Sequence, residues 1–212
     1  MNINKHLILL FSVLFFLFAV SVSSGCFRKN ESDVKSVVRN ELDQLKNLDS
    51  ETTQKYIPYT ELFPDATENT DLTDEINKTF SLFFRKFNYK ISDVIVGTAN
   101  HSATVSVKLT TINSKVLARD FKAELLRTQI TESAQAQKGN IKDSSRSLEA
   151  HYLILNHLLN TNDYDTAETD CNIQLVNTGN DKKEKWKIQR TNSLEDDLVG
   201  GLIADLADPD IL

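Results

Sequence analysis

Residues 101–111, HSATVSVKLTT, carry the pattern that decides the fold. Apolar and polar side chains alternate here with a period of two, which indicates a β-strand with one buried face and one hydrated face. The apolar positions are Ala103, Val105, Val107 and Leu109. The preceding residues 88–100, NYKISDVIVGTAN, are rich in β-branched side chains. We therefore expect the two stretches to pair as an antiparallel hairpin.

A second hairpin is predicted over residues 167–191, AETDCNIQLVNTGNDKKEKWKIQRT. Apolar side chains alternate with polar ones on both arms, and the loop between them contains Gly179 in a sequence suited to reversing the chain. The alternating apolar positions are Cys171, Ile173, Leu175, Trp186 and Ile188.

Two amphipathic helices are predicted ahead of the first hairpin, within residues 31–50 and residues 71–90. Ser32 is the expected N-cap of the first helix. The second helix has the most continuous apolar face in the chain. The apolar positions are Val34, Val37, Val38, Leu42, Leu45 and Leu48 in the first, and Ile76, Phe80, Phe83, Phe84 and Phe87 in the second.

Helical patterns also follow each hairpin. Residues 115–160 favour helix, with a break at QAQKGNIKDSS, residues 135–145. Residues 193–206 form an amphipathic pattern that starts with Ser193 and Asp196 in a capping-box-like arrangement. We expect this last helix to dock on the sheet or on the first helix, because its aliphatic side chains would otherwise face water. The predicted class is α+β, with a curved antiparallel sheet of two hairpins packed against amphipathic helices.

This order of elements resembles the bacterial lipoprotein branch of the nuclear-transport-factor-like, or cystatin-like, superfamily. A helix, then YKISDVIVGTANHSATVSVKLTTI at residues 89–112, then a late strand ending in KWKI at residues 185–188 carry the resemblance. It covers residues 32–191 and rests on pattern more than on invariant motifs. The resemblance implies a cone-like fold in which the sheet wraps a helix. Enzymes of the superfamily place a carboxylate or a tyrosine inside the cone, but neither Asp93 nor Tyr89 can be assigned that role from the sequence.

Residues 1–25 have the organisation of a secretory signal peptide. A polar start that includes Lys5 precedes an apolar core at residues 7–20, which only Ser12 interrupts. Crossing a bilayer takes about 20 apolar residues, so this core is short for a permanent transmembrane helix. We expect the segment to direct export and then to be cleaved.

The residues that follow the apolar core, SSGC at 23–26, resemble the lipobox of bacterial lipoproteins. The resemblance implies that Cys26 becomes the mature N-terminus, that its sulfur carries diacylglycerol, and that acyl chains such as palmitate hold the protein on a membrane. The family usually has Leu where this chain has Ser23. Ordinary signal cleavage after Ser23 or Gly25 is therefore one alternative, and an uncleaved anchor is another.

Composition limits what the exported part can be. Residues 26–31 are expected to form a lipidated tether, and residues 32–212 are long enough for a single domain. The formal charge of −6 argues against nucleic acid as a partner and against a polybasic membrane patch. Besides Cys26 the chain has only Cys171, so no internal disulfide is expected once Cys26 carries lipid.

No motif of a known catalytic or cofactor site occurs in the sequence. Walker loops, G-x-S-x-G, G-x-G-x-x-G and C-x-x-C are all missing. Outside the signal segment the histidines are His101, His151 and His157, and the last two are six apart, so they would point to different faces of a helix. We expect neither a cofactor nor a metal.

Two further features have ordinary structural explanations. Cys171 could serve as a nucleophile, but its position in an alternating strand pattern favours a buried thiol. The terminal acids Asp205, Asp208 and Asp210 lack the spacing and the glycine of a calcium loop, so a solvated tail is expected.

A set of aromatic side chains is the remaining candidate for a ligand site. At helical spacing on one face these side chains are typical of core, whereas in a cone-like fold they can instead line an apolar ligand pocket. The candidates for pocket or core are Phe80, Phe83, Phe84, Phe87, Tyr89 and Trp186.

The functional expectation is an exported, lipid-anchored protein of the bacterial cell envelope. We expect it to act without catalysis, by binding a partner protein or a small apolar ligand. One alternative is an enzyme that uses the interior of the cone. Another is a structural or assembly lipoprotein with a filled core, for which an exposed apolar patch would be the sign.

Overall fold

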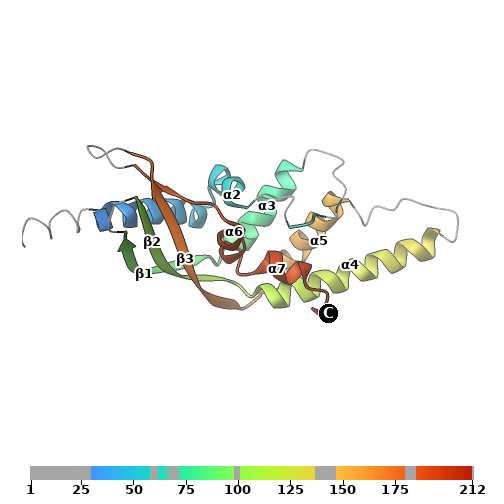
Figure 1. Cartoon of the computed structure of the whole chain (residues 1–212). Coiled ribbons are helices and arrows are strands. Elements are labelled where there is room, and N and C mark those ends of the chain that lie inside the picture. Colours follow the sequence, from blue (N-terminus) through green and yellow to red (C-terminus); the bar gives the residue numbers. More distant parts are fainter. Residues whose placement is uncertain are drawn as a thin grey trace, which may run out of the picture.

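The computed structural model describes residues 30–57, 62–64, 66, 72–97, 101–136, 147–179 and 185–211. The predicted signal peptide, Cys26 and most of the predicted tether lie outside these residues. Within them the chain has a mixed α+β fold with an open, four-stranded antiparallel sheet and seven helices (Figure 1).

The sheet is built from β1 (Asn88–Val96), β2 (Ser102–Ile112), β3 (Thr166–Asn177) and β4 (Trp186–Ile188), in that spatial order. The alternation predicted for β2 is confirmed, because its four apolar side chains are buried and the polar ones between them are half-exposed. β2 pairs along its whole length with β3, whose residues Cys171, Ile173 and Leu175 face the same core. β1 pairs with β2 on the other side and forms one edge of the sheet.

The N-terminal helix, residues 30–46, lies along the sheet (blue in Figure 1). Val34, Val38, Leu42 and Leu45 form its buried face, as the spacing predicts. Two expectations for this helix are wrong. Residue 30 is already helical, so Ser32 is not the N-cap, and the helix ends at residue 46, which leaves Leu48 exposed with a positive φ of 63°.

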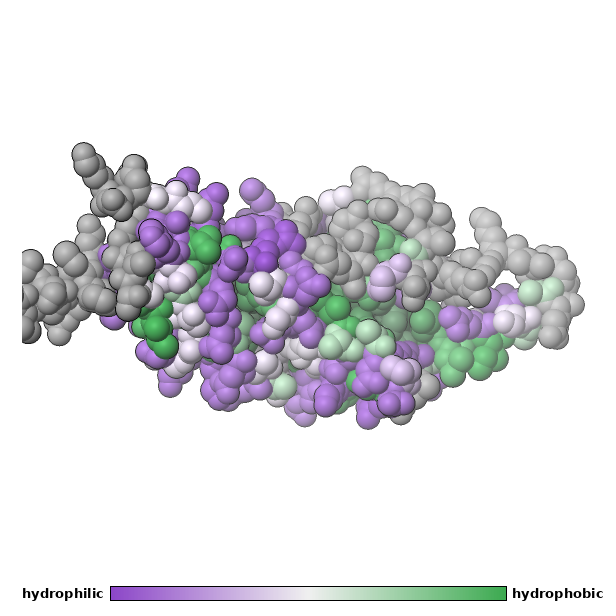
Figure 2. Space-filling view, viewed as in Figure 1, coloured by the Kyte–Doolittle hydropathy of each residue, from purple (hydrophilic) through white to green (hydrophobic). Residues whose placement is uncertain are grey.

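Among the described residues, four further helices precede the C-terminal segment, and most of them lie beyond one end of the sheet (Figure 1). They are α2 (Ser50–Tyr56), α3 (Thr73–Phe84), α4 (Ser114–Ala136) and α5 (Leu148–Thr161). α5 packs against both α3 and α4. The outer half of α4 projects past this group and carries an apolar patch that includes the exposed Leu126 and Ile130 (Figure 2).

The single C-terminal helix predicted over residues 193–206 is instead two short helices, α6 (Asn192–Leu198) and α7 (Leu202–Ala207). Gly200 and Gly201 separate them with φ values of 65° and 89°, a left-handed conformation that other residues rarely adopt. Thr191, not Ser193, caps α6 by accepting a 3.1 Å hydrogen bond from Leu194 N. α6 packs on β2 and β3, whereas α7 packs on α4.

Candidate binding groove

Five of the six aromatic candidates belong to the packed interior. Phe84 is 1% exposed, and its ring contacts those of Phe83 and Phe87 at centroid distances of 5.5 and 5.3 Å. Phe80 and Trp186 are buried as well, although one edge of Phe80 borders a small surface recess. These rings stabilise the fold by filling the space where an apolar ligand would otherwise have to lie.

Tyr89, the sixth candidate, lies at the edge of the sheet. It is half-buried on β1, and its hydroxyl donates a 2.6 Å hydrogen bond to Asp43 Oδ1 of the N-terminal helix. Burial, the hydrogen bond to Asp43 and the negative charge of that carboxylate raise the pKa of Tyr89 to about 12. Tyr89 is therefore a neutral hydrogen-bond donor at neutral pH.

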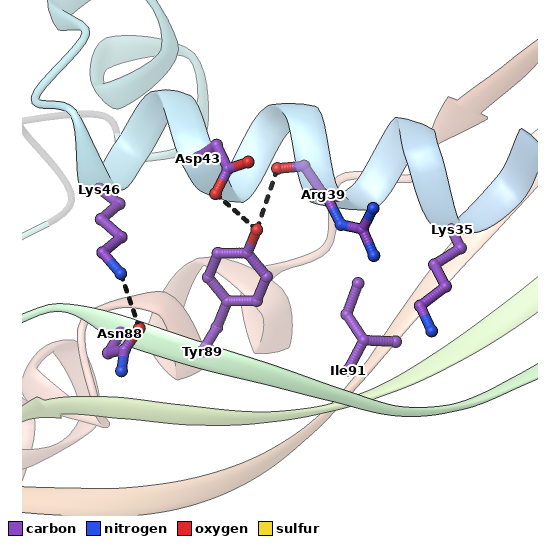
Figure 3. Close-up of a pocket in the computed structure, with 7 residues that line it drawn as sticks. All are labelled: Lys35, Arg39, Asp43, Lys46, Asn88, Tyr89 and Ile91. Carbon is purple, nitrogen blue, oxygen red and sulfur yellow. Dashed lines mark hydrogen bonds between the residues drawn. The ribbon is translucent and has the colours of Figure 1, made fainter.

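A groove runs beside Tyr89, between the N-terminal helix and β1 (Figure 3). We call it the edge groove. One part encloses about 320 Å³ and is lined by Lys35, Arg39, Asp43, Lys46, Asn88, Tyr89 and Ile91. The adjoining part encloses about 400 Å³ and is lined by Glu31, Ser32, Lys35, Ile91, Ser92, Asp93 and Val94. Lys35 and Ile91 line both parts, so the two parts form one continuous groove along β1.

The helical wall of the edge groove comes from a single stripe. Residues 35, 39, 43 and 46 recur at intervals of four, four and three, which places them on one side of the helix. The buried face described above is the neighbouring side of the same helix, because each of these residues directly follows a buried one, about 100° further around the axis. The packing of Val34 and Val38 on the sheet therefore fixes where this stripe points. Figure 3 shows the side chains of Lys35 and Arg39 on the groove side of the helix.

Positive charge is available in the first part of the groove. Lys46 Nζ donates a 2.9 Å hydrogen bond to Asn88 Oδ1, and Asp43 already accepts the hydrogen bond from Tyr89. Lys35 and Arg39 have no ion-pair partner among the residues that the structure describes. Their two cations can therefore bind carboxylate or phosphate groups of a ligand.

The floor of the groove changes shape at Ser92. The pairing of β1 with β2 shifts between Ile91 and Asp93, so Ser92 is the extra residue of a β-bulge. Its hydroxyl donates a 3.0 Å hydrogen bond to Ser106 O, and the Asp93 carboxylate accepts a 2.9 Å bond from Val94 N. Pairing with β2 is thus regular over residues 88–91, is interrupted at Ser92 and resumes over residues 93–96.

The candidate nucleophile and the histidines are not part of this groove. Cys171 is buried on β3, and burial together with the nearby Asp197 carboxylate raises the pKa of its thiol to about 12, which keeps it protonated and unreactive. His101 and His157 are exposed on different elements. The His151 ring lies tilted against that of Phe63, 4.8 Å between centroids, and its Nδ1 lies 2.8 Å from Ser147 O.

The predicted solvated tail is partly wrong. Asp208 and Asp210 are exposed, but Asp205 is buried with its Oδ2 2.5 Å from Ser114 Oγ. Asp205 therefore joins α7 to the start of α4. In the part of the chain described here, no three His, Cys, Asp or Glu side chains gather as metal ligands would.

No family model, curated protein or solved structure matches this chain. None of the helices that the structure describes combines the length and the apolar character needed to cross a membrane.

Proposed function

We propose that the protein is an exported lipoprotein of the bacterial cell envelope that acts without catalysis, by holding a partner protein in the edge groove. The observation that carries the proposal is the groove itself, which is open to solvent and offers two cations that no carboxylate of the described residues pairs. The buried aromatic rings of the interior favour a partner at the surface over an apolar ligand inside.

The position of the groove suits an anchored protein. The tether expected at residues 26–31 can extend no more than about 20 Å at about 3.5 Å per residue. The groove begins where the tether ends, at Glu31 and Ser32. With lipid on Cys26, a partner in the groove would lie close to the membrane surface. We also propose that the sheet and the N-terminal helix form the cone-like unit of the superfamily that the element order resembles.

Photo-crosslinking in cells tests the proposed function. A photoreactive residue at position 91 faces the groove. The control is a photoreactive residue at position 90, the neighbouring position of the same strand, whose side chain lies on the other face of the sheet. We expect a discrete protein adduct from position 91 and none from position 90. Equal adducts from both positions, no adduct from either, or adducts with lipid alone would reject a protein partner in the groove.

A second candidate function, assembly with another protein through an apolar surface, is favoured by the outer half of α4. Leu126 and Ile130 are 48% and 61% exposed and lie one helical turn apart. A photoreactive residue at position 130 reports on this surface. Adducts at position 130 without adducts at position 91 would favour assembly over binding in the edge groove.

A further inference from the structure

β1 has a free edge. It is the last strand of the sheet, and no described strand lies on the side away from β2. On that side alternate residues of a strand present main-chain N–H and C=O groups, which are able to pair with another extended chain. The exposed edge is therefore a template for one more strand.

The N-terminal helix runs antiparallel to β1 along this edge. Lys46 is hydrogen-bonded to Asn88, Asp43 is hydrogen-bonded to Tyr89, and Lys35 and Ile91 line the groove together. Residue numbers along the helix therefore fall as those along β1 rise. A strand added to β1 would lie about 4.8 Å from it and would follow the edge groove under the charged side of the helix.

The spacing of the two available cations fits an extended chain. Lys35 and Arg39 are four helical residues apart, a rise of about 6 Å at 1.5 Å per residue. Side chains on one face of a strand repeat every two residues, or about 6.8 Å. Carboxylates at two alternate positions of an added strand can thus face both cations at once.

We propose that the partner enters the edge groove as an extended acidic segment that adds to β1 as a fifth strand, with carboxylates at alternate positions facing Lys35 and Arg39. This proposal rests on the proposed function and names its partner chemistry. The bulge at Ser92 interrupts β1, and residues 88–91 are the regular stretch that borders the first part of the groove. An apolar segment fits less well, because it would cover both cations without pairing them.

The test uses the full chain in detergent micelles and a fluorescein-labelled peptide of alternating Glu and Thr, eight residues long, followed by fluorescence anisotropy. We expect saturable binding, and a loss of at least tenfold in affinity for Lys35→Glu combined with Arg39→Glu. The control Lys90→Glu reverses one positive charge, against two in the double variant, on the other face of β1, and should alter affinity less than twofold. Unchanged affinity in the double variant, with circular dichroism showing that it is folded, would overturn the proposal.

Backbone methylation separates strand addition from simple charge attraction. N-methyl groups on one set of alternate peptide residues point at β1 and should abolish binding, whereas methylation of the other set should be tolerated. Equal binding of the two methylated peptides would reject strand addition. Binding to phosphatidylglycerol vesicles without binding to the peptide would reject the acidic segment in favour of a lipid.

The outcomes also distinguish this proposal from the proposed function. A protein adduct at position 91 together with no peptide binding would leave the partner-binding function standing and reject its acidic, extended character. No adduct and no peptide binding would reject both.

Discussion

The Tyr89 hydroxyl and the Asp43 carboxylate, 46 residues apart in the chain, are joined by a 2.6 Å hydrogen bond that connects the edge of the sheet to the N-terminal helix. This bond holds the two walls of the edge groove at a fixed separation. It also places the Asp43 carboxylate against the tyrosine hydroxyl rather than in an ion pair with Arg39, four residues away on the same side of the helix.

Tyr89→Phe should lower the free energy of unfolding by about 1 kcal/mol, since it removes a hydrogen bond to a charged acceptor at a half-exposed site. Urea unfolding at pH 7 measures the change. Asp43→Asn is the companion variant, because an amide oxygen can still accept from Tyr89. A loss in Asp43→Asn equal to that in Tyr89→Phe would show that the charge of the acceptor, rather than the hydrogen bond alone, matters.

Stability should fall as the pH rises above about 10. The pKa of Tyr89 is raised to about 12 in the folded protein, and those of Tyr56 and Tyr164 are also raised, mainly by burial. Unfolded tyrosines ionise near pH 10, so between pH 10 and 12 the folded state holds protons that the unfolded state has lost. The stabilisation is complete below pH 10 and is lost through this window. In urea unfolding at several pH values, the free energy of unfolding should fall less steeply between pH 10 and 12 in Tyr89→Phe than in the wild type.

Phe84→Ala should cost about 3–5 kcal/mol, the range for deleting a buried aromatic ring from a packed core. Phe84 is almost fully buried and contacts the rings of Phe80, Phe83 and Phe87. Leu126→Ala, on the exposed side of α4, is the matched control and should change stability by less than about 0.5 kcal/mol. A small loss for Phe84→Ala, close to that of the control, would indicate an open pocket around the ring.

Gly200→Ala should disrupt the junction between α6 and α7. The added Cβ would lie 2.2 Å from Thr111 Oγ1, and the backbone φ there is +65°. We expect a loss of more than about 2 kcal/mol, from the contact and the backbone strain together. Gly97→Ala is the control, because its added Cβ would come no closer than 3.1 Å to the Ser102 hydroxyl. Equal melting temperatures for the two variants would contradict this account of Gly200.

Cys26→Ser should release the protein from membranes or stall its processing, if Cys26 carries the lipid as predicted. Metabolic labelling with palmitate, followed by membrane fractionation, measures both. Cys171 provides an internal control, because its buried and protonated thiol should take no label. An intact mass equal to that of an unmodified chain starting at Ser24 or Cys26 would reject lipid attachment.

The sequence was sufficient for elements whose pattern is local. The two-residue alternation of β2 and the helical spacing of Phe80, Phe83 and Phe84 each predict a buried face, and both faces are buried. The spacing of apolar residues predicts burial in these elements because only one face of each contacts the core.

The C-terminal segment shows where local pattern was insufficient. Its apolar residues keep helical spacing across Gly200 and Gly201, so a single helix was expected. The two glycines adopt positive φ and interrupt the helix, at a point where Gly200 lies so close to Thr111 on β2 that a side chain would not fit. This close approach becomes visible only when the two segments meet. The burial of Asp205 against Ser114 likewise depends on a contact between residues 91 positions apart.

The sequence by itself therefore determined which side of each helix and strand is buried, since that follows from the spacing of apolar residues along one element. Only the tertiary structure decided which elements are neighbours. The stripe of residues 35, 39, 43 and 46 can be found in the sequence as the polar side of a helix, yet nothing local says that β1 lies beside it. The edge groove exists because pairing with β2 leaves β1 at the edge of the sheet and core packing lays the helix along it.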